Sequence, residues 1–267
     1  MTELPDPLLR PVRPRFSTGR AIIALILREM STTYGRSPGG YVWAIVEPAA
    51  GIALLTAIFS VGFRSPPLGT SFALFYASGM LPFLMFMEIT SKVGQTIGFS
   101  RNLLEYPRVT FLDAILARLL LSFFTQLMVH FILVFSILHF LAPSTLLNVS
   151  SIAAGYFMAL VLAAGIGTLN SFLNLAYPLW VTVWAITTRP LFLASAIFFV
   201  FDSVPQPYSD YLWFNPLIHV VGMMRDGYYP FYHPNYLSVA YVMAVGAVTG
   251  LTGLFLLHRY HRTILDK

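Results

Sequence analysis

The sequence predicts an all-α membrane protein with six transmembrane helices, an amphipathic interface helix before the first span, and a re-entrant or interfacial helix before the last. Three observations predict this class. Of the 267 residues, 57% are hydrophobic and only 10% are charged, whereas soluble domains carry about a quarter charged residues. Six segments approach the roughly 20 apolar residues that cross a bilayer. The basic residues also gather on one side of the resulting topology.

The third predicted span is the longest apolar segment of the chain. At 1.5 Å per residue it would extend about 45 Å, too far for one hydrocarbon crossing. Its first turns, with Asp113 and Arg118, are therefore expected to project into the cytoplasmic interface. The predicted spans are residues 43–63, 71–90, 112–141, 152–175, 180–204 and 236–257.

The distribution of charge sets the expected orientation. Six arginines precede the first span, and basic residues recur between the second and third spans and after the sixth, whereas the opposite side receives only Arg64 and Arg225. The positive-inside rule then places both termini and the 91–111 loop in the cytoplasm. Because the basic residues flank apolar runs and form no stripe with stacking aromatics, the net charge of +5 does not indicate nucleic-acid binding.

The N-terminal part, residues 1–36, is expected to be a cytoplasmic arm that ends in the interface helix, and residues 37–267 to form the six-span domain. The arm is proline-rich and has no signal-peptide pattern. In residues 17–36, Ile22, Ile26 and neighbouring apolar residues share one helical face and Arg20 and Arg28 another, after a Ser17 or Thr18 N-cap. This pattern is typical of a helix lying in the cytoplasmic leaflet. A soluble helix packed on a partner is the alternative.

The segment 203–235 is too apolar for a free external loop, since it holds eight aromatic residues, Trp213 among them, and five prolines. Asn215 followed by Pro216 is a helix start, and Gly227 is a plausible stop. We expect a short helix at about 216–226 that dips into the outer leaflet as a re-entrant element. An aromatic interfacial belt is the alternative explanation.

Recognisable catalytic chemistry is missing from the sequence. No phosphate-binding Gly-Lys-Ser/Thr, no Gly-x-Ser-x-Gly and no His-Glu-x-x-His occurs, the six histidines are scattered, and there is no cysteine. We therefore expect no catalytic residue, no metal site and no cofactor bound by this chain, and any ATP-driven work must come from a partner. A membrane-embedded enzyme remains possible only through unrecognised residues. A self-sufficient secondary carrier is disfavoured because no internal repeat is visible.

Arg189 is the most unusual charge, because it lies about 14 Å into the predicted fifth span by helical rise. Such a residue should face a bundle interior or aqueous cavity and have a partner. The carboxylates of Glu47, Glu88 and Asp113 are all expected at shallower depth. Arg189 is thus expected either to meet a substrate anion or to cap carbonyls freed by Pro190. Glu47, Glu88 and Arg118 are expected to form ion pairs, with gating or substrate contact as the alternative.

Two further segments carry expectations about packing and docking. Gly246, Gly250 and Gly253 form a small-residue face on the sixth span, which favours close packing inside the subunit over a dimer seam. The 91–111 loop is long for a plain connection. A helix at about 93–106, stopped before Pro107, would present a docking surface to the cytoplasm.

Three motifs in order resemble those of permeases of type-2 ABC exporters, in the capsular-polysaccharide export branch (KpsM-type). YGRSPGGYVWAIVEP at residues 34–48 resembles the YGRSxLGxxWxxxEP pattern that leads into the first span. RPLFLASAIFF at 189–199 resembles RPLFxxSGxFF in the fifth span, with Ala196 in place of glycine. NPLIH at 215–219, followed by Arg225, resembles the re-entrant NPLxH…R motif. The resemblance covers essentially the whole chain.

The resemblance implies a half-transporter in the bacterial inner membrane. Two copies would pair with two copies of a separate ATPase, which would bind the ATP and Mg²⁺, and would move a lipid-linked, acidic capsular polysaccharide out of the cytoplasm. Membrane lipids and periplasmic export proteins are further expected partners. An O-antigen or teichoic-acid exporter is the alternative within this class.

The resemblance also implies roles for particular residues. The substrate path would include Arg189, Trp43, Glu47, Tyr41, Trp213 and Arg225. The ATPase-coupling residues would be Phe99, Arg101, Asn102, Glu105 and Tyr106. The interface helix would act through Arg20, Arg28 and Arg36 near a lateral gate.

Overall fold

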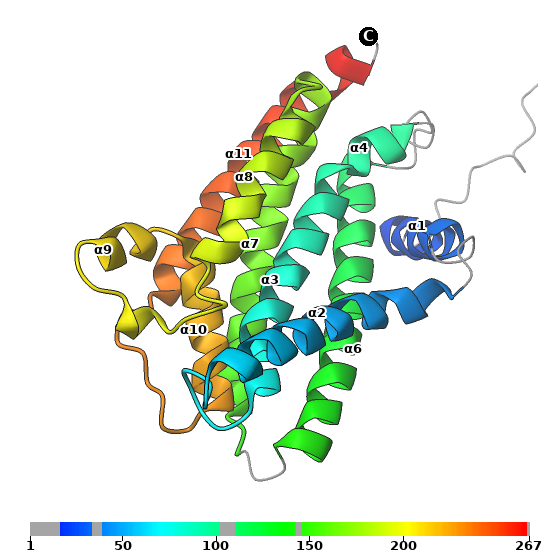
Figure 1. Ribbon diagram of the computed structural model, residues 1–267. Coiled ribbons are helices and arrows are strands. Elements are labelled where there is room, and N and C mark those ends of the chain that lie inside the picture. The colour runs from blue at the N-terminus through cyan, green and yellow to red at the C-terminus, as the bar shows by residue number, and fades with distance from the viewer. Residues whose placement is uncertain (1–16, 34–38, 102–109, 143–145, 266–267) are drawn as a thin grey trace, which may run out of the picture.

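The computed structural model describes residues 17–33, 39–101, 110–142 and 146–265, and this part of the chain is helical without a strand (Figure 1). Its elements are α1 (Ser17–Thr33), α2 (Gly40–Gly62), α3 (Phe72–Gly94), α4 (Thr96–Phe99), α6 (Phe111–Leu141), α7 (Val149–Ala176), α8 (Trp180–Ala194), η2 (Phe201–Ser203), α9 (Tyr208–Trp213), α10 (Pro216–Tyr228) and α11 (Val239–Leu265).

Within these described ranges, five helices are long and apolar enough to cross a membrane, namely α2, α3, α6, α7 and α11. This confirms the predicted all-α membrane class. The fifth predicted span, residues 180–204, corresponds to α8, which has only 15 residues. The number of six spans therefore stays a prediction.

Helix α3 forms the centre of the bundle. It packs against α2, α6, α7 and α10. In its most apolar stretch of 18 residues, 78% of the residues are buried, compared with 11% in the corresponding stretch of α2 and 17% in that of α11. Helix α2 crosses in front of α3 and α6 at an oblique angle, and α1 lies beside α6 outside the main bundle (Figure 1). Most of the surface of α2 is thus left for contact with lipid or with another chain.

Glycines bring α7 and α11 into close contact, which confirms the prediction that the small-residue face packs inside the subunit. A Cβ added to Gly165 on α7 would lie 2.0 Å from the Gly246 carbonyl oxygen on α11. A Cβ on Gly253 would lie 2.6 Å from the Leu169 backbone nitrogen. Only a residue without a side chain permits this approach of two helix backbones.

Helix α10 begins where the sequence predicted. The Asn215 side chain accepts a hydrogen bond from the Leu217 N–H at 3.1 Å, and Pro216 occupies the first turn, where its missing N–H costs nothing. The helix was expected at about 216–226, and it continues through Gly227 to Tyr228. The helix is buried against α3 and α7.

The predicted helix over 180–204 is also wrong in length, because α8 ends at Ala194. Ala196 has a left-handed backbone (φ 59°), which no α-helix contains. The guanidinium of Arg225 donates to the carbonyls of Ile197 at 3.1 Å and Phe199 at 2.7 Å. These bonds satisfy backbone groups that a longer helix would have paired internally. Arg189 consequently lies in the last two turns of α8, not in the middle of a long span.

Candidate functional site

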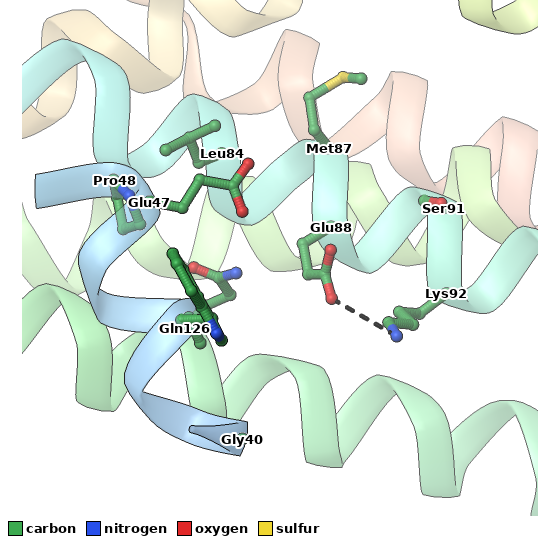
Figure 2. A pocket seen from close by; sticks show the side chains of 11 residues that line it. Gly40, Glu47, Pro48, Leu84, Met87, Glu88, Ser91, Lys92 and Gln126 are labelled. Carbon is green, nitrogen blue, oxygen red and sulfur yellow. Dashed lines mark ion pairs between the residues drawn. The ribbon is translucent and has the colours of Figure 1, made fainter. Parts of the chain in front are cut away.

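A polar pocket opens between α2, α3 and α6 and has a volume of about 490 Å³. It lies toward the end of the bundle that carries α4, which is called the α4 end below. Figure 2 shows the carboxylates of Glu47 and Glu88 projecting from two different helices into this space. We call this space the head pocket. It is lined by Gly40, Trp43, Ala44, Glu47, Pro48, Leu84, Met87, Glu88, Ser91, Lys92 and Gln126.

The charges of the head pocket are only partly paired. Lys92 lies 3.8 Å from Glu88, one turn away on α3. Glu47 is exposed and makes no ion pair with any residue that the structure describes. Pro48 has no N–H, so the Ala44 carbonyl lacks its usual intrahelical donor. The pocket therefore offers more hydrogen-bond acceptors than donors.

Arg118 on α6 and Glu29 on α1 form a buried ion pair that the sequence analysis missed. Arg118 Nε donates to Glu29 Oε2 at 2.9 Å, and the two side chains are 6% and 8% exposed. A guanidinium nitrogen of Arg118 also donates to the Lys92 carbonyl at 2.9 Å. Its guanidinium lies 4.1 Å from the centre of the Phe99 ring on α4. Arg118 thus joins α1, α3, α4 and α6 at one point.

Two further carboxylates, Glu88, which was expected to form an ion pair, and Asp113, which was expected near the cytoplasmic interface, have partners close in sequence. Glu88 pairs with Lys92, as just described, and Asp113 is buried at the start of α6. There the Asp113 carboxylate accepts from the Thr110 N–H at 3.0 Å, while the Thr110 side chain accepts from the Asp113 N–H at 3.2 Å. This reciprocal capping box fixes the helix start. Asp113 is consequently a structural residue.

The interface helix and coupling residues are described only in part. Arg28 lies over the Phe99 ring at 5.5 Å, and Arg20 is exposed on α1. The predicted single helix at 93–106 is broken, since α3 ends at Gly94 and α4 covers only Thr96–Phe99. Arg101 is exposed next to α4. The other predicted residues of these two sets, Arg36, Asn102, Glu105 and Tyr106, lie outside the described residues.

The predicted substrate-path residues do not come together in one place. Trp43 and Glu47 line the head pocket, and Tyr41 lies two residues before Trp43 on α2, with a side chain outside the described set. Arg189 is exposed on α8 and makes no hydrogen bond or ion pair with a described residue. It therefore does not cap the carbonyls near Pro190 here, and the anion contact stays a prediction.

Arg225 and Trp213 are packed inside the subunit. Arg225 is 1% exposed, and its guanidinium lies 4.2 Å from the centre of the Phe75 ring in addition to its two carbonyl contacts. The Trp213 indole N–H donates to the Tyr236 carbonyl at 3.1 Å, and its ring packs on His219. In this structure both residues stabilise the segment between α8 and α11.

One serine, aspartate and histidine lie close together but not in a catalytic order. Ser151 donates to one carboxylate oxygen of Asp226, and His233 Nδ1 lies 3.1 Å from the other. A hydrolytic triad needs the histidine between the serine and the carboxylate. No group of three metal-ligating side chains is found within the described ranges either. This part of the chain gives the enzyme alternative no support.

Together these features define a helical, multi-span membrane protein with an interface helix fixed to its bundle and a polar pocket between three spanning helices. A family model described as ABC-2 type transporter matches residues 20–229. The chain belongs to this family of transporter membrane proteins.

Individual relatives match over almost their full length. The chain is 30% identical over 244 residues to the polysialic acid transport protein KpsM of Escherichia coli, covering 91% of this chain and 95% of the relative. It is 27% identical over 256 residues to the capsule polysaccharide export inner-membrane protein BexB of Haemophilus influenzae, covering 92% and 93%. It is 23% identical over 246 residues to the corresponding protein CtrC of Neisseria meningitidis serogroup A, covering 92% of each.

Proposed function

We propose that this chain is the membrane subunit of an ATP-driven exporter that moves a lipid-linked, acidic capsular polysaccharide from the cytoplasm across the inner membrane. The observation that carries the proposal is the match of 91–92% of the chain to membrane proteins named for polysialic acid transport and capsule export. The orientation of the charges supports a multi-pass topology with both termini in the cytoplasm. The α4 end of the bundle would then face the cytoplasm.

ATP hydrolysis belongs in this proposal to a separate subunit, two copies of which would pair with two copies of this chain. The residues around α4 would be the docking surface. Support comes from Phe99, which is 42% exposed and contacts the guanidinium of Arg118. Because Arg118 also binds Glu29, a displacement of α4 would reach both the interface helix and α6. Movement driven by the nucleotide would thus be transmitted through one buried cation.

The polymer would leave the cytoplasm along exposed faces of α2 and α8, with a second copy completing the channel. Helix α2 presents Trp43 and Glu47 near the α4 end, and α8 presents Arg189. Aromatic rings suit the apolar faces of sugars, and an arginine suits carboxylate or phosphate groups on the polymer. Periplasmic export proteins would receive the polymer on the other side.

The docking part of the proposal is tested by co-purification. The chain purified alone should hydrolyse no ATP, and a co-expressed nucleotide-binding subunit should copurify with it. Reversing the charges of Arg101 and Glu105 together should abolish this association, whereas reversal of the distant, exposed Arg64 is the matched control. Normal association of the double variant would refute the placement of the docking surface.

An O-antigen or teichoic-acid polymer is the alternative substrate. Neither the head pocket nor α8 distinguishes these polymers from capsule by charge alone. Chemical analysis of the glycan that accumulates inside cells lacking this chain separates the alternatives. A capsular polymer supports the proposal, and an O-antigen or teichoic-acid polymer replaces it.

A further inference from the structure

A second cavity adjoins the head pocket on the side away from the α4 end. It has a volume of about 360 Å³ and is mainly apolar, and the Ser136 hydroxyl on its wall is already bonded to the Ile132 carbonyl at 2.8 Å. We call this cavity the chain groove. It is lined by Ala49, Ile52, Ala53, Thr56, Ala57, Ala73, Leu133, Ser136, Ile137 and Leu141.

The two cavities lie along the same faces of the same helices. On α2, a stripe with i, i+4 spacing begins with Ala44 and Pro48 in the head pocket and continues with Ile52 and Thr56 in the chain groove. On α6, Gln126 lines the head pocket, and residues two to four turns further on line the groove. The two cavities thus follow one another along the space between α2 and α6, called the cleft below, with a polar lining at the α4 end and an apolar lining beyond it.

The dimensions and polarity of this cleft match those of a lipid. The ten residue steps from Glu47 to Ala57 cover about 15 Å along the axis of α2, a length similar to the share of one leaflet in a hydrocarbon core of roughly 30 Å. A molecule of the leaflet at the α4 end would place its polar head beside Glu47 and its chain along Ile52 and Leu133. Burial of chain methylenes against these side chains is favourable relative to water.

The head pocket favours hydroxyl groups over a phosphate alone. Its carboxylates, Glu47 and Glu88, and the carbonyl of Ala44 accept hydrogen bonds, and Lys92, the one cation among the described lining residues, is already paired with Glu88. A bare phosphate head would meet this net negative lining, whereas sugar hydroxyls donate to carboxylates. Trp43 adds an aromatic surface for a sugar ring.

We propose that the cleft between α2 and α6 binds the lipid anchor of the exported glycan, with the hydroxyls of the sugar next to the anchor at Glu47 and Gln126 and the acyl chain in the chain groove. This inference rests on the proposed export function. It assigns the anchor to a cleft inside one subunit, apart from the exposed face of α8 that carries Arg189.

Photolabelling of the purified full-length chain in phosphatidylcholine nanodiscs tests the site. The probe is an alkyl glucoside with a diazirine on its chain, and the comparison probe is a phosphatidylcholine with the diazirine at the same chain position. The glucoside should label residues 49–57 and 133–141 and be displaced by excess unreactive glucoside, and the phosphatidylcholine should not concentrate there. Equal labelling of the cleft by both probes would mean a bulk lipid groove and would overturn the proposal.

A matched pair of variants on α2 sharpens this measurement. Ala53→Phe fills the chain groove, and we expect labelling to fall about tenfold, the equivalent of about 1.4 kcal/mol. Leu54→Phe, one residue along, alters a side chain that is 60% exposed and lies outside the groove, and should label normally. The same loss in both variants, or in neither, would contradict the assignment.

Export in cells separates failure of this site from failure of the proposed function. If deletion of the chain leaves surface glycan unchanged, the export function itself is wrong. If deletion abolishes surface glycan and Ala53→Phe restores it as well as Leu54→Phe does, the export function stands and the anchor site is wrong. We expect restoration by Leu54→Phe alone.

Discussion

Arg118 on α6 holds Glu29 of the interface helix in a buried ion pair, with 2.9 Å between Nε and Oε2. The same guanidinium covers the Phe99 ring of α4. The interface helix is therefore fixed to the bundle by a charge contact, while the apolar side chains of Ile23 and Leu27 remain exposed on its other side. This is the arrangement expected of a helix that lies at a membrane surface and moves with the spans.

Breaking this pair from one side should destabilise the protein strongly. Glu29→Leu leaves a buried cation without its carboxylate, which costs about 3–5 kcal/mol in buried pairs. We expect a markedly lower apparent Tm and loss of export. Replacing both members, as Glu29→Leu with Arg118→Met, should restore most of the thermal stability, because two apolar side chains fill the space without a charge. Thermal unfolding of the wild type, Glu29→Leu, Arg118→Met and the double variant in one detergent measures this. If the losses of stability in the two single variants add up in the double variant, the pair is not direct.

Ala196 occupies a position that suits glycine. Its φ of 59° costs an L-residue about 1–2 kcal/mol relative to the right-handed region. Ala196→Gly should therefore raise the apparent Tm by a few degrees, despite the greater entropy of glycine in the unfolded chain. Ala185→Gly, inside α8, is the matched control and should lower it. A lower Tm for Ala196→Gly would show that the alanine side chain contributes packing that outweighs the strain.

The glycine contact between α7 and α11 should tolerate no side chain. Gly165→Ala places a methyl group against the Gly246 carbonyl, so the helices must separate, and overpacking of this kind typically costs about 1–3 kcal/mol. Gly62→Ala, with open space around its Cβ position, should be near neutral. The thermal stability of the two variants checks this. If Gly165→Ala changes only the oligomeric state, the small-residue face contacts a second copy instead.

Arg189 and Arg225 should behave differently although both are arginines in apolar surroundings. Arg225→Ala removes the donors of two carbonyls and a ring contact, so we expect poor folding and low abundance in the membrane. Arg189→Ala removes an exposed side chain, so we expect normal abundance and normal association with the ATPase, but little export. Immunoblots and a surface-glycan assay separate the two, and full surface glycan in Arg189→Ala would show that transport does not need this side chain.

Local signals in the sequence predicted much of the fold. The Asn215 cap with Pro216 gave the start of α10, and the apolar run at 112–141 gave α6 to within a residue, because caps and hydrophobic runs act over a few neighbouring residues. The end of α8 was not predictable in this way. It depends on Ala196 and on hydrogen bonds from Arg225, which comes from a later helix.

The candidate site was predictable only in part for the same reason. The motif around Trp43 and Glu47 marked one wall of the head pocket, but Gln126 and Lys92 reach it from other helices. Glu29 carried a usable signal, since it continues the i, i+4, i+7 stripe of Ile22 and Ile26 toward the buried side of α1. Its partner Arg118 lies 89 residues away, and only the fold brings them together.

The central claim is that this chain forms the membrane path of an ATP-driven glycan exporter. The most direct measurement is glycan uptake into inverted membrane vesicles that contain the chain and its ATPase. The account predicts uptake of lipid-linked capsular polysaccharide that requires ATP and is lost in Arg189→Ala vesicles holding normal amounts of both subunits. Uptake without ATP, or equal uptake by vesicles lacking the chain, would contradict it.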